Sequence, residues 1–325
     1  MSTLTPSEVR SKFGQLFCRR FITMVDETNR MVEIIEECSA KGPVEWDAVN
    51  RLRAGGVVRK AWTEGTTLHL IAGIGEVPVS FGPSSKELGG QALEAVEIKG
   101  NLVSTTWVGI AGAGLGIAAC LPQGEGVIQA HYPTEDDLTK VGGTRVNRVT
   151  LVTPKAQKVV VGLDDTDEKE KGATWALGLK AARSLDGKSG VEFLAHRIIQ
   201  LYPGVSWKTT NCVSTALIFA AREKEQLVAE LRRSLETGIF SQNASMAVKV
   251  GISVPLALIA YGKQAKRRIL TYEEAVDVAN RTGVELIPIT GNRGSIGALA
   301  AVACADMGIE AAALADDSGL FKVST

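Results

Sequence analysis

The chain has 325 residues, a length that suits about two domains. Its 45% hydrophobic and 22% charged content is typical of a globular protein, and its formal net charge of zero excludes a globally basic surface for nucleic acid, although not a local basic patch. Aromatic residues make up 5% of the chain, so any base-stacking platform must be small.

The five cysteines lie far apart in the sequence and form no C-x-x-C pair. This spacing indicates neither a zinc ribbon nor a redox pair, and it favours buried free thiols in a reducing compartment. The first residues carry no apolar signal region, and the longest apolar runs, residues 103–121 and 250–261, are interpreted as core. We therefore expect a cytoplasmic protein that makes no contact with a membrane.

The N-terminal half has a helical pattern followed by strand patterns. Apolar residues recur at helical spacing over residues 3–40, and this predicts a helix. The glycine-rich run Gly109–Gly116 does not have the G-x-G-x-x-G spacing, so it favours close packing over dinucleotide binding. We predict an N-terminal α+β domain over residues 1–152, of unassigned role, with strands at 66–74, 95–98, 103–110 and 148–152.

After a polar segment around Pro154, strands and helices alternate, and this predicts a second domain over residues 153–325. Thr271 and Glu274 fit a capping box, and Gly283 fits a helix end. The fold class is α/β, with α+β left open, and the second domain has a mixed sheet with flanking helices. The predicted strands are 158–163, 191–201, 212–220 and 284–289, the helices are 174–184, 221–236, 272–282 and 296–307, and 248–261 is either a strand or a core helix.

Three carboxylates follow the apolar strand at 159–163. They are Asp164, Asp165 and Asp167, and they repel one another unless a cation compensates them. Carboxylates bind hard divalent cations, and the helix that opens after Gly172 offers free backbone N–H groups to a phosphate. The stretch therefore predicts a magnesium–nucleotide site, with a solvated turn as the alternative.

Three further features accompany this stretch. Thr174 stands at the helix start, where it either caps the helix or contacts a phosphate. Lys208 lies in a loop with two residues that could orient a ligand, and a glycine-rich turn around Arg293 could hold a phosphate or simply allow tight packing. The residues concerned are Thr209, Asn211, Gly291, Asn292 and Gly294.

The segments VGLDDTDEKEKGATWAL, QLYPGVSWKTTN and TGNRGSIGALAAVA occur in this order along the chain. With them, residues 157–318 resemble the kinase domain of the archaeal isoleucine-tRNA agmatinylcytidine synthetase, and the whole chain resembles methanogenesis marker protein 11. The resemblance implies ATP and Mg²⁺ at Asp164, Asp165 and Asp167. It also implies phosphoryl transfer at Thr174, with Lys208 and the Gly291–Gly294 turn near the nucleotide.

The sequence departs from the synthetase in several places. Trp175 stands where the synthetase has a second threonine, and the segment after Lys208 lacks its arginine and glycine. No C-x-x-C is present for a zinc ribbon. We therefore expect that tRNA is not a partner.

Three functions follow from the resemblance. The first is an ATP- and Mg²⁺-dependent phosphoryl-transfer or activation enzyme of methanogenesis, acting on an unidentified small molecule or protein. The second is a nucleotide-binding assembly factor with a protein partner, such as methyl-coenzyme M reductase. The third is a tRNA-modification enzyme.

Overall fold

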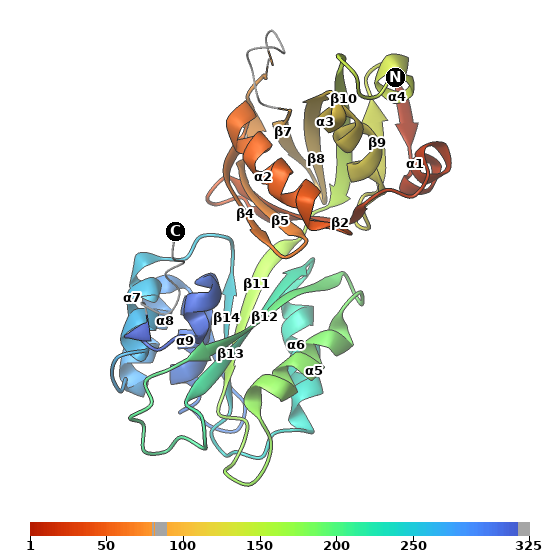
Figure 1. The fold of residues 1–325 in the computed structure, drawn as a ribbon. Coiled ribbons are helices and arrows are strands. Elements are labelled where there is room, and N and C mark those ends of the chain that lie inside the picture. The colour runs from red at the N-terminus through yellow and green to blue at the C-terminus, as the bar shows by residue number, and fades with distance from the viewer. Residues whose placement is uncertain (80, 82–89, 318–325) are drawn as a thin grey trace. The chain divides into compact units, whose positions relative to one another are not determined.

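The computed structural model describes residues 1–79, 81 and 90–317. The chain divides into two compact units, Met1–Ala156 and Gln157–Thr325, and this division lies near the predicted boundary at residue 152. The last residues of the predicted second domain, 318–325, lie outside the described residues. Each unit is described by itself below (Figure 1).

The first unit contains two antiparallel sheets, with strand orders β1-β9-β10-β8-β7-β6 and β2-β3-β5-β4. Phe21 and Trp107, which meet edge to face, belong to its core. The elements are β1 (Ser2–Leu4), α1 (Pro6–Phe13), β2 (Cys18–Asp26), β3 (Met31–Cys38), α2 (Lys41–Ala54), β4 (Val58–Glu64), β5 (Thr67–Gly73), β6 (Gly75–Glu76), β7 (Gln91–Lys99), β8 (Leu102–Ile110), α3 (Gly112–Leu115), η1 (Gly116–Cys120), η2 (Leu121–Gln123), β9 (Gln129–Tyr132), α4 (Glu135–Thr139) and β10 (Val146–Pro154).

The helix predicted over residues 3–40 is wrong. Only α1 is helical there, with a capping box at Thr5, while β1 and the β2–β3 hairpin form strands. Both strands of the hairpin are buried over most of their length, so apolar residues occupy both of their faces. A strand buried on both faces loses its alternation of apolar and polar residues, and its pattern then imitates a helix.

The second unit is a five-stranded antiparallel sheet, order β12-β13-β11-β14-β15, with helices on both faces. Helices α5 and α6 pack on one face, and α7, α8 and α9 pack on the other (Figure 1). The elements are β11 (Gln157–Asp164), α5 (Thr174–Leu185), β12 (Val191–Gln200), β13 (Val213–Ala221), α6 (Lys224–Glu236), β14 (Ser245–Val250), α7 (Leu256–Ala265), α8 (Tyr272–Thr282), β15 (Glu285–Pro288), α9 (Ser295–Cys304) and η3 (Gly308–Ala312).

The predicted sheet with flanking helices is confirmed, but the sheet of the second unit is antiparallel throughout and not mixed as predicted, because the sequence pattern does not reveal strand direction. The capping box at Thr271 and the left-handed Gly283 end of α8 are confirmed as well. Residues 248–261 are neither one strand nor one helix. They divide between β14 and α7, because Gly251 has a φ of 101° and Pro255 precedes the helix.

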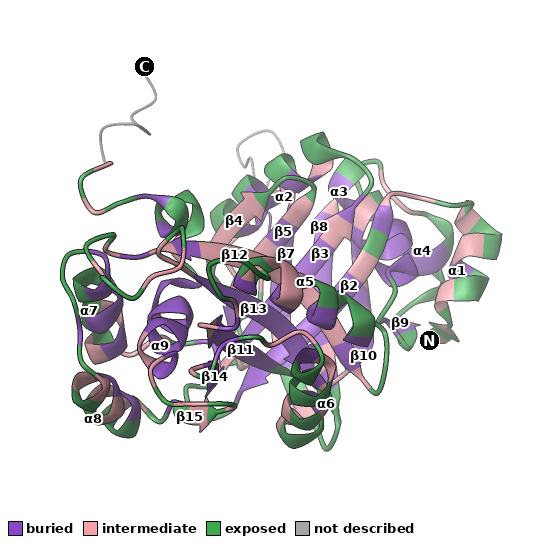
Figure 2. Cartoon of the chain, turned by 90° about the horizontal axis from the view of Figure 1, so that it is seen from below, coloured by how far each residue is buried: buried purple, intermediate pink, exposed green. Residues whose placement is uncertain are grey.

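Strand β11 lies at the centre of the second sheet, and its residues alternate between the two helical layers. Val161 and Leu163 belong to the α5–α6 core, whereas Gly162 faces α9. A Cβ at Gly162 would lie 1.9 Å from the carbonyl oxygen of Ala298, so only glycine lets α9 lie this close to the strand. Helix α9 is accordingly almost entirely buried, while α6 and α8 carry exposed residues (Figure 2). Among the residues that the structure describes, no helix is long and apolar enough to cross a membrane.

Candidate functional site

A cavity of about 220 Å³ opens at the end of β11 where the carboxylates lie. Its walls come from the loop between β11 and α5, the loop between β12 and β13, the residues after α7 and the turn before α9. Segments far apart in the sequence therefore meet at one end of the sheet. The predicted site residues that line the cavity are Asp164, Asp165, Asp167, Gly172, Thr174, Lys208, Thr209, Asn211 and Arg293.

Asp164 is the last residue of β11 and lies on the face covered by α9. A Cβ at Gly297 would lie 1.8 Å from its Oδ2, so the carboxylate occupies the space that a side chain would fill. Burial and then the negative charge of Asp165 raise the pKa of Asp164 well above its usual value, with a smaller contribution from Asp167. The negative charge of the Asp164 carboxylate is thus poorly neutralised by neighbouring groups of the protein, and a bound cation would stabilise it.

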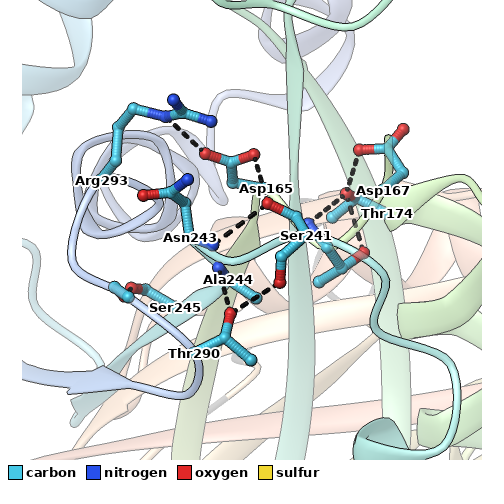
Figure 3. Close-up of polar contacts among 11 residues, drawn as sticks. Asp165, Asp167, Thr174, Ser241, Asn243, Ala244, Ser245, Thr290 and Arg293 are labelled. Atoms are coloured by element: carbon cyan, nitrogen blue, oxygen red, sulfur yellow. Dashed lines mark hydrogen bonds and ion pairs between the residues drawn. The ribbon is translucent and has the colours of Figure 1, made fainter. Parts of the chain in front are cut away.

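Asp165 has a left-handed backbone, with φ of 59°, which a non-glycine residue adopts rarely. Its side chain accepts a hydrogen bond from Arg293 Nε at 2.8 Å and another from Ser241 Oγ at 3.2 Å (Figure 3). The arginine therefore neutralises one of the three acids, and its terminal nitrogens have no hydrogen-bond partner among the described residues. Asp165 thus joins the end of β11 to the turn before α9 and to the loop before β14.

A serine loop before β14 supports this contact, and the sequence did not reveal it. Ser241 Oγ accepts a hydrogen bond from the backbone N–H of Asn243 at 3.1 Å. Thr290 Oγ1 donates to the carbonyl of Ser241 at 2.8 Å and accepts from the N–H of Ala244 at 2.9 Å (Figure 3). These bonds fix the loop at 241–244 against the glycine-rich turn. The run of polar residues at 241–245 could have indicated this loop in the sequence. The residues that it contacts lie far away along the chain, so the sequence did not show what the loop supports.

Thr174 is the first residue of α5 and is 4% exposed. Its hydroxyl accepts hydrogen bonds from Thr166 N at 3.1 Å and from Thr166 Oγ1 at 2.9 Å, and it donates to Asp167 Oδ1 at 3.1 Å (Figure 3). The N-cap of α5 is Ala173, which makes no side-chain capping bond. The capping interpretation of Thr174 is therefore wrong, because its hydroxyl contacts the acidic loop instead. Its role in phosphoryl transfer stays a prediction.

The loop between β12 and β13 places Lys208, Thr209 and Asn211 along the cavity. No carboxylate of the described residues lies within ion-pair distance of Lys208. Burial, together with the charge of Asp164, raises the pKa of Cys212 to about 11, and the charge of Lys208 opposes this shift. Lys208 therefore supplies positive charge to the cavity without being neutralised by a salt bridge among the described residues.

Glycines around the site have different structural roles. Gly172 has a φ of 84° and lines the cavity, whereas Gly291, Asn292 and Gly294 are not among the described residues that line it. A Cβ at Gly294 would lie 2.6 Å from a backbone oxygen of Asn243 and would collide with it. The glycines of this turn are therefore required for tight packing. A contact between the turn and a nucleotide stays a prediction.

The carboxylates of the cavity suit a magnesium ion that is held together with phosphate. Among the described residues, no group of three or more His, Cys, Asp or Glu side chains is arranged to hold a metal by itself. Mg²⁺ is commonly bound by one or two carboxylates together with phosphate oxygens and water. Asp164 and Asp167 fit that arrangement, because both line the cavity and Arg293 contacts only Asp165.

The cavity also has aromatic and apolar walls that the sequence analysis did not assign. Trp175 and Trp207 line it and stay about half exposed, and Tyr202 and Leu270 add apolar area. The sequence contained a signal for these walls. Aromatic residues are scarce in the chain, yet two of its five tryptophans stand next to predicted site residues. Flat exposed aromatic rings beside charged groups suit ligands that contain a base.

Several known proteins are similar to this chain. The family model of the TiaS TCKD domain matches residues 160–246. The uncharacterized protein MJ0921 of Methanocaldococcus jannaschii is 35% identical over 287 residues, which cover 88% of this chain and 93% of that protein. The isoleucine-tRNA 2-agmatinylcytidine synthetase TiaS of Pyrococcus horikoshii is 30% identical over 148 residues, covering 44% of this chain and 34% of the synthetase. A solved complex of TiaS with its tRNA and ATP has a TM-score of 0.41 and 24% identity, covering 45% of this chain and 36% of that chain.

The expectation that tRNA is not a partner is contradicted by these similarities. The curated relatives of the second unit are synthetases that are named for an isoleucine tRNA. A formal net charge of zero does not oppose tRNA binding, because a local basic patch is sufficient.

This chain spans about a third of the length of the synthetase that it matches, whereas it spans nearly all of MJ0921. The chain therefore belongs to the same protein family as MJ0921 of Methanocaldococcus jannaschii, and its second unit contains a region similar to the TiaS TCKD domain.

Proposed function

We propose that the protein is an ATP-using enzyme that modifies tRNA, with its reaction centre in the cavity of the second unit. The observation that carries this proposal is the contact between Thr174 and Asp167 in a cavity also lined by Lys208 and Arg293. Further support comes from the curated relatives that match this unit, which are synthetases named for an isoleucine tRNA. ATP is the nucleotide that the resemblance of the three sequence segments implies.

Each side chain has a role in this proposal. Lys208 and the terminal nitrogens of Arg293 would contact phosphate oxygens, since both are cationic and line the cavity. Asp164 and Asp167 would hold Mg²⁺, which neutralises phosphate charge when it is bound. Gly172, Thr209 and Asn211 would position the nucleotide, with Gly291, Asn292 and Gly294 supporting the turn that carries Arg293.

Thr174 would accept a phosphoryl group from ATP, and the rest of the nucleotide would leave as the new oxygen–phosphorus bond forms. Its hydroxyl already donates a hydrogen bond to Asp167, so Asp167 is placed to take the proton when the oxygen attacks. The two bonds from Thr166 hold the oxygen in position. A carboxylate that accepts the proton of an attacking hydroxyl is also the base that protein kinases use.

The test is incubation of the full chain with Mg²⁺, ATP labelled at the α- or γ-phosphate, and total tRNA. We expect ADP or AMP to form, with turnover increased by tRNA. The variant Thr174→Ala should lose roughly 100-fold or more of the turnover, as expected for removal of a group in proton or phosphoryl transfer. Thr174→Ser is the matched control and should retain most of it, because it keeps the hydroxyl.

Two outcomes would overturn the proposal. Equal ATP turnover by Thr174→Ala and the unmodified chain would remove Thr174 from the reaction. Saturable ATP binding with no labelled product, with or without tRNA, would instead favour a nucleotide-binding assembly factor.

We also propose that the family shared with MJ0921 is the methanogenesis marker protein 11 family that the sequence resembles. A role in methanogenesis and a cytoplasmic location are part of this proposal. Deleting the gene in a methanogen and measuring methane formation together with tRNA modification would test the methanogenesis role and the tRNA activity. Unchanged tRNA modification with lost methane formation would favour the marker role without the tRNA activity.

A further inference from the structure

A groove of about 380 Å³ lies beside α2 in the first unit, where nothing above assigns a function. Two aromatic side chains, a carboxylate, an amide and glycines line it. They include Phe17, Trp46, Asp47, Gln91, Gly112 and Gly116. Since its residues belong to the first unit, this groove is separate from the cavity that contains Thr174.

A buried network with excess negative charge forms one side of the groove. Arg51, which is fully buried, bonds Glu36 and lies 3.4 Å from Asp47 Oδ2 and 3.3 Å from Gln91 Oε1. Gln91 Nε2 also donates to Asp47 Oδ1. Two carboxylates thus share one guanidinium, and Asp47 is the one that lines the groove. An uncompensated buried charge is costly, so a cation in the groove would stabilise it.

The residue next to Asp47 on α2 suits a cation that carries apolar atoms. Trp46 is 51% exposed and contributes an aromatic surface, and aromatic faces attract cations. Within the same unit the guanidinium of Arg51 already lies over the ring of Trp107 at 4.5 Å. The mostly apolar lining leaves Asp47 as the charged group that a ligand would meet.

The segment Gly109–Gly116, which has no dinucleotide-binding pattern, forms part of this groove. Ala111 has a φ of 57°, and α3 passes directly into the π-helical turn η1. Side chains at Gly112 or Gly116 would meet nothing within 4 Å, so glycine at these positions leaves open space. Strained residues and π-helical turns occur often at functional sites.

We propose that this groove binds a primary ammonium group carried on a short apolar chain, with Asp47 as its counter-ion and Trp46 as its aromatic wall. Gln91 holds Asp47 Oδ1, and Arg51 contacts Oδ2 only at 3.4 Å, so a compact ammonium that makes one contact with Oδ2 suits this carboxylate better than a guanidinium fork. A metal ion fits less well, since Asp47 is the one carboxylate among the described residues that line the groove. The ammonium group could belong to a free amine or to a lysine side chain.

The test is calorimetric titration of the full chain with n-butylammonium and with neutral butan-1-ol. We expect saturable binding of the ammonium and binding of the alcohol that is roughly tenfold weaker or more, since a charge-assisted hydrogen bond is lost. Asp47→Asn, which keeps the shape of the side chain, should weaken ammonium binding by a similar factor. Glu45→Gln changes an exposed acid on the same helix and should leave it unchanged.

A second pair of variants examines the aromatic wall. Trp46→Ala should weaken binding, whereas Val49→Ala, equally exposed on α2, should not. The compound Nα-acetyl-lysine methylamide keeps the lysine side-chain ammonium free. Tighter binding of this compound than of butylammonium identifies a lysine side chain as the ligand, and the reverse order identifies a free amine. The proposal is overturned if the folded chain fails to bind butylammonium, if butanol binds equally well, or if Asp47→Asn binds as the unmodified chain does.

Discussion

At the scale of single residues, both units contain a carboxylate whose charge the fold leaves under-compensated. Burial raises the pKa of Asp47 to about 6, and the charge of Arg51 opposes this shift. Burial and the neighbouring acids raise the pKa of Asp164 as well. An acid with a raised pKa holds its proton more tightly in the folded state, so folding becomes less favourable as the pH rises through that pKa.

For Asp47, the folded chain binds more protons than the unfolded chain between about pH 4 and pH 6. Stability therefore falls as the pH rises through this window, and Asp47→Asn should not show that loss. We expect the variant to match the unmodified chain near pH 4 and to be more stable at pH 7.5 by on the order of 1–3 kcal/mol. Urea unfolding at the two pH values measures this, and a variant that is less stable at pH 7.5 would contradict it.

For Asp164, the same reasoning predicts opposite effects on stability and on ligand binding. Asp164→Asn removes a poorly compensated charge, so the protein without nucleotide should be as stable as the unmodified chain or more stable at neutral pH. Magnesium–ATP should stabilise the unmodified chain by ligand linkage but stabilise the variant much less. Thermal unfolding with and without magnesium–ATP provides the comparison. Equal stabilisation of both proteins would show that Asp164 does not contact the metal–phosphate group.

At the scale of elements, close approach of α9 to the sheet builds the second unit's site. Gly162 and Gly297 are the contact points, and the second brings the helix onto Asp164. The sequence predicted α5, α8 and β11 to within a few residues, because their periods and end signals are local. It did not predict the β2–β3 hairpin or the division of 248–261, because burial on both faces removes the period on which such predictions depend.

Gly297→Ala should disturb this contact. The new Cβ would lie 1.8 Å from Asp164 Oδ2, so the carboxylate or the helix must move. We expect a loss of roughly 1–3 kcal/mol in the free energy of unfolding, as for overpacked cores, together with weaker ATP binding. Gly42→Ala is the control, because it is also a helical glycine but its Cβ would meet nothing within 4 Å. That control should change stability by about 1 kcal/mol or less, and equal effects of the two substitutions would contradict the packing argument.

At the scale of the whole molecule, the two units have separate hydrophobic cores. Among the described residues, a large and a small apolar cluster contain only residues of Met1–Ala156, and two further clusters contain only residues that follow it. Units with their own cores commonly fold by themselves. The two proposed sites follow this division, since the Thr174 cavity lies in the second unit and the Asp47 groove in the first.

Residues 1–156 and 157–325, expressed separately, should each fold and unfold cooperatively. The second piece should bind magnesium–ATP with an affinity within about tenfold of the full chain, because every described residue that lines the cavity is in it. Circular dichroism and calorimetry measure folding and binding. A folded second piece that does not bind ATP, while the full chain does, would show that the first unit contributes to the site.

The sequence by itself determined the elements with local signals and the acidic stretch at the end of β11. These depend on side-chain period, capping residues and chain order, all of which lie within a few residues of one another. Only the tertiary structure decided which residues meet. It placed Arg293 on Asp165 and Thr174 on Asp167, and it joined Asp47 to Arg51 and Gln91. Such contacts arise from sheet order and helix packing, which bring distant segments together without leaving a local pattern in the sequence.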